Sequence, residues 1–169
     1  VHQSLSTVGK KSRNGSYLTP GNIIDESLAD LHMQPRTFLD PCCGTGRYLL
    51  RAARLFSIDP HRLYGFDVDP AAVDIASVNL LLDHPDWDFM PRIRCLNSLT
   101  DLANGQPECD TNNLLNTVDA IATNPPWGSN HQYATPSSRN TRLKSNESFS
   151  LFLEKSLTLL RPGGRMSFV

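Results

Sequence analysis

The sequence predicts an α/β protein with a doubly wound, mostly parallel β-sheet. Short apolar runs of strand length alternate with segments in which apolar residues recur at helical spacing. The first apolar run leads into a turn that contains two glycines and then into a helical segment, which is the start of a strand-loop-helix unit. In such sheets, ligands bind at the carboxyl ends of the strands where the strand order reverses. The residues that follow the strands are therefore the candidate functional residues.

The composition is that of one ordinary globular domain. The chain has 169 residues, of which 39% are hydrophobic and 20% charged, and its formal net charge is −1. No apolar run approaches the length of a membrane span, and no apolar signal core is seen at the N-terminus, so we expect a cytoplasmic protein without membrane contact. The cysteines lack metal-ligand spacing, so neither a zinc site nor a disulfide framework is expected. They are Cys42, Cys43, Cys95 and Cys109.

Two polar segments are predicted to lack regular structure. Residues 1–14 are rich in Ser, Lys and Arg and are interpreted as a flexible basic arm, which leaves residues 15–169 as the folded domain. Small polar residues dominate between Trp127 and Glu147, which indicates either a mobile basic loop beside the site or an ordinary loop. The basic residues of this loop are Arg139, Arg142 and Lys144.

A short amphipathic helix is predicted near the N-terminus. Thr19 stands where an N-cap is expected, and Pro20 stands where the first helical residue is expected. The helix must end before Pro35, because proline disfavours a helical conformation in the residue that precedes it. Its apolar positions, spaced i, i+4 and i+7, are Ile24, Leu28 and Leu31.

Residues 37–40 form the first predicted strand, and the loop Pro41–Gly46 leads from it into a helix. The two glycines of the loop allow a tight turn and a close approach to a ligand. Dinucleotide sites have a third glycine, which is replaced here by Leu49, so a nicotinamide or flavin cofactor is disfavoured. Asp40 directly before the loop suits a ligand with a cationic end. The apolar positions of the helix are Leu49, Ala52, Ala53 and Phe56.

Residues 62–67 form the second predicted strand, about twenty residues after the glycine loop. At this spacing an acidic side chain at the strand end, here Asp67, can accept both hydroxyls of a ribose. Asp69 is predicted to cap a helix that begins at Pro70. The alternative is that Asp67 is a second capping residue.

Two further strands, residues 93–96 and 118–123, end before Asn97 and before the motif Asn124-Pro125-Pro126-Trp127. Each proline removes a ladder donor and fixes a backbone angle, so the chain must leave the sheet at the motif. An amide, a carbonyl and an aromatic face are left at the strand end, and these groups can hold an exocyclic amine while stacking on its ring. A polar turn with Trp127 packed on the core is the ordinary alternative.

The last predicted elements are a helix over residues 147–160 and a fifth strand that begins at Arg165. The helix is expected to end at Pro162-Gly163-Gly164. Because the chain stops inside the fifth strand, we expect the fold to be truncated there and the sequence to be a piece of a longer protein.

Taken together, these motifs resemble those of class I S-adenosylmethionine-dependent methyltransferases, and specifically the N6-adenine DNA methyltransferases of restriction-modification systems. Asp40–Gly46 resembles the cofactor loop, Gly65–Pro70 the ribose motif and Asn124–Trp127 the catalytic motif. Gly15–Pro20 is similar to the family's leading methionine-binding segment. This motif order is that of the subgroup with a C-terminal target-recognition region. The resemblance implies a Rossmann-like methyltransferase fold.

The resemblance also implies S-adenosylmethionine as the cofactor. Asp67 would take the ribose hydroxyls, Val68 would pack on the adenine, and Asn97 would reach the adenine amino group. Aspartate is commoner in the family at the position of Asn97, and alanine is frequent at that of Cys42. An amide can still accept from the amine, and a small thiol fills similar space. The methionine end would lie against Tyr17, Thr19, Asp40 and the loop residues Pro41, Cys42, Gly44 and Gly46.

The implied reaction is methyl transfer to the exocyclic N6 amine of an adenine rotated out of duplex DNA. The lone pair of this amine is delocalised into the ring, so the nitrogen is a poor nucleophile. In the motif that also contains Pro126, the Asn124 side-chain carbonyl and the Pro125 backbone carbonyl would accept its hydrogens, and Trp127 would stack on the flipped base. No metal is required. A target-recognition domain or subunit outside this chain would read the DNA sequence.

Two other functions fit the same motifs. A methyltransferase that acts on a protein glutamine or an RNA base has a closely related motif, although Trp127 and the leading Gly15–Pro20 segment favour DNA adenine. A subunit that binds the cofactor without catalysis is the other alternative. Intact Asn124, Asp67 and Gly44 argue against it.

Overall fold

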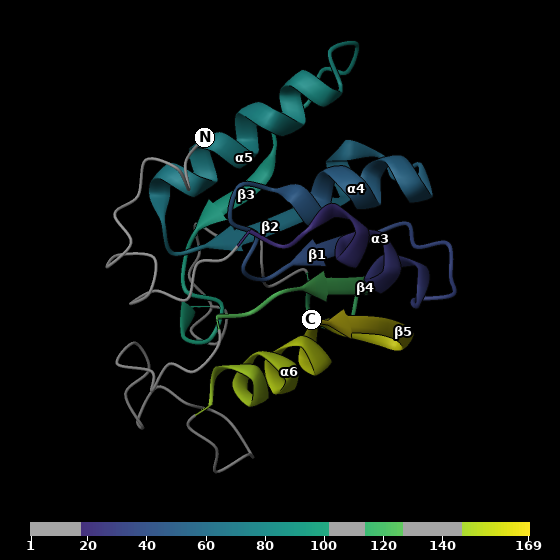
Figure 1. The fold of residues 1–169 in the computed structure, drawn as a ribbon, viewed down its shortest axis with the longest axis vertical. Helices are drawn as coiled ribbons and strands as arrows, with labels where there is room; N and C mark the ends of the chain where they lie inside the picture. The colour runs from purple at the N-terminus through teal and green to yellow at the C-terminus, as the bar shows by residue number, and fades with distance from the viewer. Residues whose placement is uncertain (1–17, 102–113, 127–146) are drawn as a thin grey trace.

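The computed structural model describes residues 18–101, 114–126 and 147–169, which form a single sheet with helices on both faces (Figure 1). The predicted basic arm, the basic loop with Arg139, Arg142 and Lys144, and Cys109 lie outside the described residues. The helices are α3 (Gly21–Ala29), α4 (Arg47–Phe56), the short 3-10 helix η1 (Pro60–Arg62), α5 (Pro70–Asp83) and α6 (Ser148–Leu159). The strands are β1 (Phe38–Asp40), β2 (Leu63–Asp67), β3 (Arg92–Cys95), β4 (Val118–Thr123) and β5 (Leu160–Phe168).

The sheet has the order β3-β2-β1-β4-β5, and all four neighbouring pairs of strands are parallel. After β1 the chain adds strands outward on one side, and it then returns to place β4 on the other side of β1. The strand order therefore reverses between β1 and β4, which confirms the predicted doubly wound sheet. No helix in the described ranges is long and apolar enough to cross a membrane.

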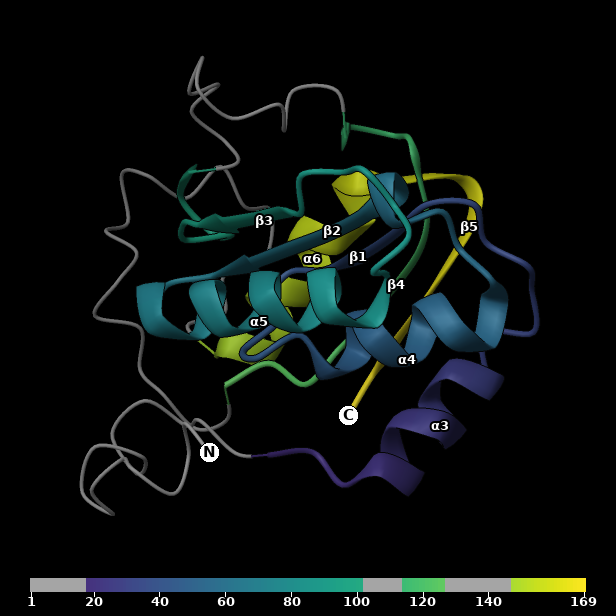
Figure 2. The same cartoon turned by 90° about the horizontal axis from the view of Figure 1, so that it is seen from above.

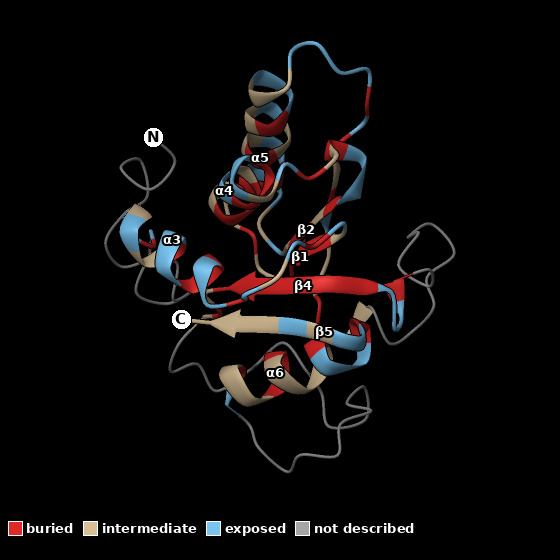
Figure 3. Ribbon diagram, turned by 90° about the vertical axis from the view of Figure 1, so that its right-hand side faces the viewer, coloured by how far each residue is buried: buried red, intermediate tan, exposed pale blue. Residues whose placement is uncertain are grey.

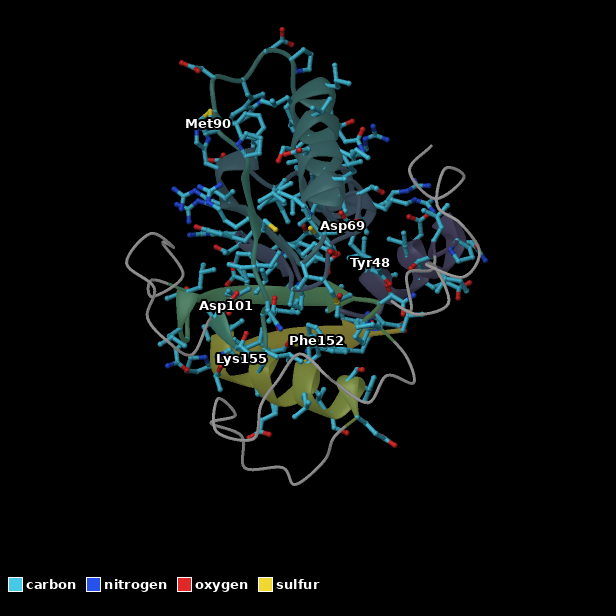
Figure 4. The ribbon with its side chains drawn as sticks, turned by 90° about the vertical axis from the view of Figure 1, so that its left-hand side faces the viewer. Tyr48, Asp69, Met90, Asp101, Phe152 and Lys155 are labelled. Atoms are coloured by element: carbon cyan, nitrogen blue, oxygen red, sulfur yellow. The ribbon has the colours of Figure 1, made fainter. Side chains whose placement is uncertain are left out.

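The helices cover the two faces of the sheet as two separate layers. Helices α3, α4 and α5 lie on one face and α6 lies on the other (Figures 2 and 3). Figure 4 shows Tyr48 on the side of the three helices, and Phe152 and Lys155 on α6 at the opposite side. One apolar cluster, which includes Phe38, packs under α3, α4 and α5, and a second, which includes Leu39, packs under α6. Consecutive residues of β1 thus enter opposite cores, as the alternation of side chains along a strand requires.

Strand β4 is the most enclosed element of the sheet. All six of its residues are buried, because β1 and β5 flank it and helices cover both faces. The sequence predicted this strand with the same bounds. A run of small and branched apolar residues suits a strand that is buried on both faces.

The start of α3 differs from the prediction. The helix begins at Gly21, the N-cap residue is Pro20 in an extended conformation, and no side chain caps the helix. The prediction that Thr19 is the N-cap is wrong, because its hydroxyl instead accepts a hydrogen bond from Asn124, 105 positions away in the sequence. The predicted apolar face is confirmed, since the side chains of Ile24 and Leu28 are fully buried.

The end of α6 also differs from the prediction. The helix ends at Leu159, and β5 begins at once at Leu160, so that Pro162-Gly163-Gly164 lies inside the strand. The strand accommodates this segment by a shift in register between the pairs Val118↔Leu160 and Ala120↔Arg165. A side chain at Gly164 would lie 3.0 Å from the backbone oxygens of both Arg161 and Asp119. The glycine that we interpreted as a helix terminator therefore permits a close approach to β4.

Gly65 determines how closely β2 packs on the glycine loop. A methyl group at this position would lie 2.7 Å from Leu49 Cδ1 and 3.0 Å from Cys43 Sγ. We predict that Gly65→Ala lowers the free energy of unfolding by about 1–3 kcal/mol, because it overpacks the contact between β2, the loop and α4. Urea unfolding followed by circular dichroism measures this change.

Gly21→Ala is the matched control for that substitution. Its methyl group would meet only the guanidinium ends of Arg51 and Arg47, at 3.1 and 3.8 Å, and these ends can move. Its helical position favours alanine by up to roughly 1 kcal/mol. Equal destabilisation by the two alanines would contradict the packing role of Gly65.

Candidate functional site

The parallel sheet brings the candidate residues to one edge. Asp40 is the last residue of β1, Asp67 the last of β2, and Asn124 directly follows β4. Asn97 comes two residues after the end of β3. Since all strands run in the same direction, these residues collect at the carboxyl edge of the sheet, on both sides of the point where the strand order reverses.

Asp40 and Thr123 join the ends of β1 and β4. The Thr123 hydroxyl donates to Asp40 Oδ1 over 2.6 Å, and the backbone N–H of Cys42 donates to the same oxygen over 3.2 Å. Thr123 Oγ1 also lies 2.9 Å from the Cys42 thiol. The side chains of Asp40 and Thr123 are 1% and 0% exposed. The carboxylate is thus held rigidly at the centre of the edge.

The Asp40 carboxyl is electrostatically uncompensated. Burial raises its pKa from an ordinary value of 3.8 to about 7, against the lowering effect of the hydrogen bonds from Thr123 and Cys42, and the charge of Asp67 raises it further. None of the ion pairs among the described residues involves Asp40. A buried carboxylate without a cationic partner attracts a cationic ligand group, which would lower the pKa again.

The glycine loop is bent so that its backbone is open to a ligand. Gly44 and Gly46 have φ values of +51° and +82°, which side-chain-bearing residues rarely adopt. A methyl group at Gly44 would have no neighbour within 4 Å, whereas one at Gly46 would lie 3.1 Å from the Ala76 side chain. Gly44 therefore borders open space, and Gly46 allows α4 to begin close to α5.

Asp67 fastens this loop to β2. Its carboxylate accepts the Gly44 N–H over 2.7 Å and the Asp69 N–H over 3.0 Å. Burial raises the pKa of Asp67, and the two backbone donors oppose this effect. Asp69 caps α5 by accepting from Ala71 N, which confirms its predicted structural role. The ribose contact of Asp67 stays a prediction, and the exposed side chain of Val68 lies next to it in the sequence.

Asn97 lies in a tight turn after β3. Its side-chain oxygen accepts from Leu99 N over 3.0 Å, and its own N–H donates to Asp101 Oδ2 over 2.7 Å. The neighbouring Ser98 hydroxyl donates to the Pro41 carbonyl over 2.6 Å, which ties the end of β3 to the glycine loop. A carbonyl oxygen accepts two hydrogen bonds, so the turn leaves Asn97 able to accept from an adenine amine.

Asn124 is connected to the segment before α3. Its side-chain N–H₂ donates to Thr19 Oγ1 over 3.1 Å, and the Thr19 carbonyl accepts from Arg47 Nη1 over 2.5 Å. Pro125 is buried and Pro126 is half-buried. The structure thus brings Thr19 and Asn124 together, while Tyr17 and Trp127 lie outside the described residues.

Both cysteines of the glycine loop are held as neutral thiols. Burial, and next to it the charge of Asp40, raise the pKa of Cys42 and of Cys43 well above the ordinary value. A neutral buried thiol is a poor nucleophile and a poor metal ligand. Cys43 is buried and Cys42 is partly exposed. No metal-binding cluster occurs among the described residues.

Three contributors to the site were not predicted from the sequence. Thr123 could have been suspected, because it is a polar residue at the end of an apolar run that directly precedes the Asn-Pro-Pro motif. The other two, Arg47 and Ser98, make contacts that no local pattern indicates.

Comparison with known proteins finds similarity to one family, the N-6 DNA methylases, over almost the whole chain. The sequence profile of N-6 DNA methylases matches residues 4–169. The type II methyltransferase M.VspI of a Vibrio species is 26% identical over 174 residues, which cover 100% of this chain and 40% of that protein. The methylase subunit of the type I restriction enzyme StySPI of Salmonella potsdam is 28% identical over 171 residues, or 94% of this chain and 32% of that subunit. The chain thus spans less than half the length of these relatives.

Solved structures show the same fold. The M protein of the type I restriction enzyme EcoKI is similar with a TM-score of 0.67 and 27% identity, over 93% of this chain and 34% of that protein. A modification subunit of a putative type I restriction enzyme from Vibrio vulnificus has a similar fold, with a TM-score of 0.70 and 22% identity over 91% of this chain and 34% of that subunit. The profile match over residues 4–169 decides the assignment, and the chain belongs to the N-6 DNA methylase family.

Proposed function

We propose that the protein transfers the methyl group of S-adenosylmethionine to the exocyclic N6 amine of adenine in DNA, with the base rotated out of the duplex. The observation that carries this proposal is the junction of β1 and β4. There Asp40, suited to a cationic ligand, and Asn124, suited to an amine acceptor, stand at the ends of neighbouring strands and are linked through Thr123. Membership of the N-6 DNA methylase family supports DNA over RNA or protein as the substrate.

The residues at the edge fit the chemical groups of S-adenosylmethionine. Asp40 would bind its ammonium group, and Asp67 would accept its ribose hydroxyls while keeping the bond from Gly44. Val68 has an exposed apolar side chain suited to packing on an adenine ring, and Asn97 has an acceptor for its amino group. When bound, S-adenosylmethionine supplies an electrophilic methyl group on a sulfonium.

Asn124 and Pro125 would hold the amine that accepts the methyl group. Because Asn124 Nδ2 donates to Thr19, its Oδ1 faces away from that bond and can accept a hydrogen of an exocyclic amine. The Pro125 carbonyl can accept the second hydrogen. Two fixed acceptors favour a pyramidal nitrogen whose lone pair is free to attack, so positioning and electrostatics carry catalysis without a strong base.

We also propose that further polypeptide supplies target recognition. Some relatives are themselves methylase subunits of type I restriction enzymes. The chain has a net charge of −1, which provides little attraction for phosphates. A recognition region in the same protein or in a partner subunit would provide most of the DNA contacts.

A crossed pair of substitutions separates the two halves of the site. In the native protein, Asp67→Asn should weaken S-adenosylmethionine binding roughly tenfold or more, because an amide lacks the charge that favours two ribose donors. Asn124→Ala should leave that affinity nearly unchanged and lower kcat at least a hundredfold, because the Asn124 side chain is assigned to the amine that accepts the methyl group. Calorimetric titration and tritium transfer to unmethylated DNA measure the two effects. Loss of binding in Asn124→Ala together with normal binding in Asp67→Asn would contradict the assignment.

The raised pKa of Asp40 predicts opposite effects of pH on binding and on stability. Affinity for S-adenosylmethionine should fall as the pH falls below about 7, because protonation removes the charge that binds the ammonium group. A carboxyl whose folded-state pKa exceeds 3.8 stabilises the fold most at low pH, and this contribution is lost as the pH rises to about 7.

Asp40→Asn tests both effects. At pH 8 the neutral amide removes an uncompensated buried charge, so the ligand-free variant should unfold at a higher temperature than the wild type. At pH 5 the two should differ little, because Asp40 is already neutral. The variant should bind S-adenosylmethionine weakly at either pH. Scanning calorimetry and titration at both pH values measure these outcomes, and a stability difference that does not change with pH would contradict the charge account.

A further inference from the structure

We propose that the Thr19 hydroxyl is a positioning group that fixes the orientation of the Asn124 amide and couples it to the carboxylate of the bound cofactor. The inference rests on the proposed function and extends it. Its basis is the 3.1 Å hydrogen bond from Asn124 Nδ2 to Thr19 Oγ1. Thr19 is only 9% exposed, so water does not compete freely for this bond.

The direction of this bond decides which end of the amide faces the acceptor. An amide has a carbonyl end that accepts and an N–H₂ end that donates. With Nδ2 on Thr19, Oδ1 is presented to the amine hydrogens. If the amide were turned over, its N–H₂ group would face the amine hydrogens, and the amine would lose an acceptor. Catalysis therefore requires that the Thr19 oxygen acts as the acceptor in its bond with Asn124.

A hydroxyl can act in either direction unless its own proton is occupied. A hydroxyl has one proton and two lone pairs. No described residue accepts a hydrogen bond from the Thr19 hydroxyl. The cofactor carboxylate is an anionic acceptor, and the methionine end of the cofactor is expected beside Thr19. When that carboxylate accepts a hydrogen bond from the Thr19 hydroxyl, only the lone pairs of the Thr19 oxygen remain for the bond with Asn124. Cofactor binding thereby holds the amide in the orientation that accepts from the amine.

The backbone around Thr19 is fixed independently of its side chain. The Thr19 carbonyl accepts from Arg47 in α4, and α3 is tied to α4 by the bond from Ser27 Oγ to Tyr48 Oη over 3.2 Å. Thr19→Val has nearly the same shape and keeps the bond from Arg47. The variant therefore removes the hydroxyl without removing the segment.

The first test compares kcat with cofactor affinity in the native protein. At saturating S-adenosylmethionine, Thr19→Val should lower kcat roughly tenfold, the effect of one lost hydrogen bond, and Thr19→Ser should restore most of it. Thr158→Val, which removes an exposed threonine hydroxyl from α6, is the control and should leave kcat unchanged. If Thr19→Val raised only the cofactor KM and left kcat intact, Thr19 would be a binding residue and the inference would be wrong.

The second test probes the coupling with decarboxylated S-adenosylmethionine, which carries the same methyl group without the carboxylate. In the wild type, this donor should lower kcat about as much as Thr19→Val does. In Thr19→Val, S-adenosylmethionine and its decarboxylated form should give nearly equal kcat, because the hydroxyl that would bind the carboxylate has been removed. Independent, multiplying effects of variant and donor would overturn the coupling. Methyl transfer by the wild type is measured first, and its absence would overturn the proposed function and this inference with it.

Discussion

A hydrogen bond of 2.6 Å between Thr123 and Asp40 joins the sheet at the point where its strand order reverses. Thr123 comes immediately before Asn124, and Asp40 comes immediately before the glycine loop. The bond therefore sets the distance between the residues assigned to the methyl acceptor and those assigned to the cofactor. Asp67 at the end of β2 also contacts the glycine loop, because its carboxylate accepts a hydrogen bond from the Gly44 N–H.

The two buried aspartates of the central strands have opposite electrostatic surroundings, which suit a structural role for Asp119 and the proposed ligand-binding role for Asp40. Asp119, near the start of β4, accepts from the N–H groups of Arg36 and Thr37 and from Arg161. Burial alone would raise its pKa, but these donors lower the pKa below its ordinary value. Asp40 has no such cation, and its pKa is raised to about 7. Asp119 closes the amino edge of the sheet, whereas Asp40 leaves an unbalanced charge at the edge that is open to a ligand.

Local patterns in the sequence were sufficient for the sheet and for the Asp69 cap, because strand alternation and capping depend on neighbouring residues. They failed where a distant contact prevailed. Thr19 stands where an N-cap is expected, but its hydroxyl accepts a hydrogen bond from Asn124, which follows β4. Pro162-Gly163-Gly164 has the composition of a helix terminator, but β4 accommodates it within a strand. Such contacts depend on which strands become neighbours, and no short stretch of sequence contains that information.

The most direct test of this account is a crystal structure of the protein with S-adenosylmethionine bound. The account predicts that the ammonium group of the cofactor binds Asp40 and that the ribose hydroxyls donate to Asp67. The hydrogen bonds from Gly44 N to Asp67 and from Asn124 Nδ2 to Thr19 should be retained. The transferable methyl group should then face the Asn124 carbonyl end. A cofactor bound with its ribose away from Asp67, or with its ammonium group bound elsewhere than Asp40, would contradict the account.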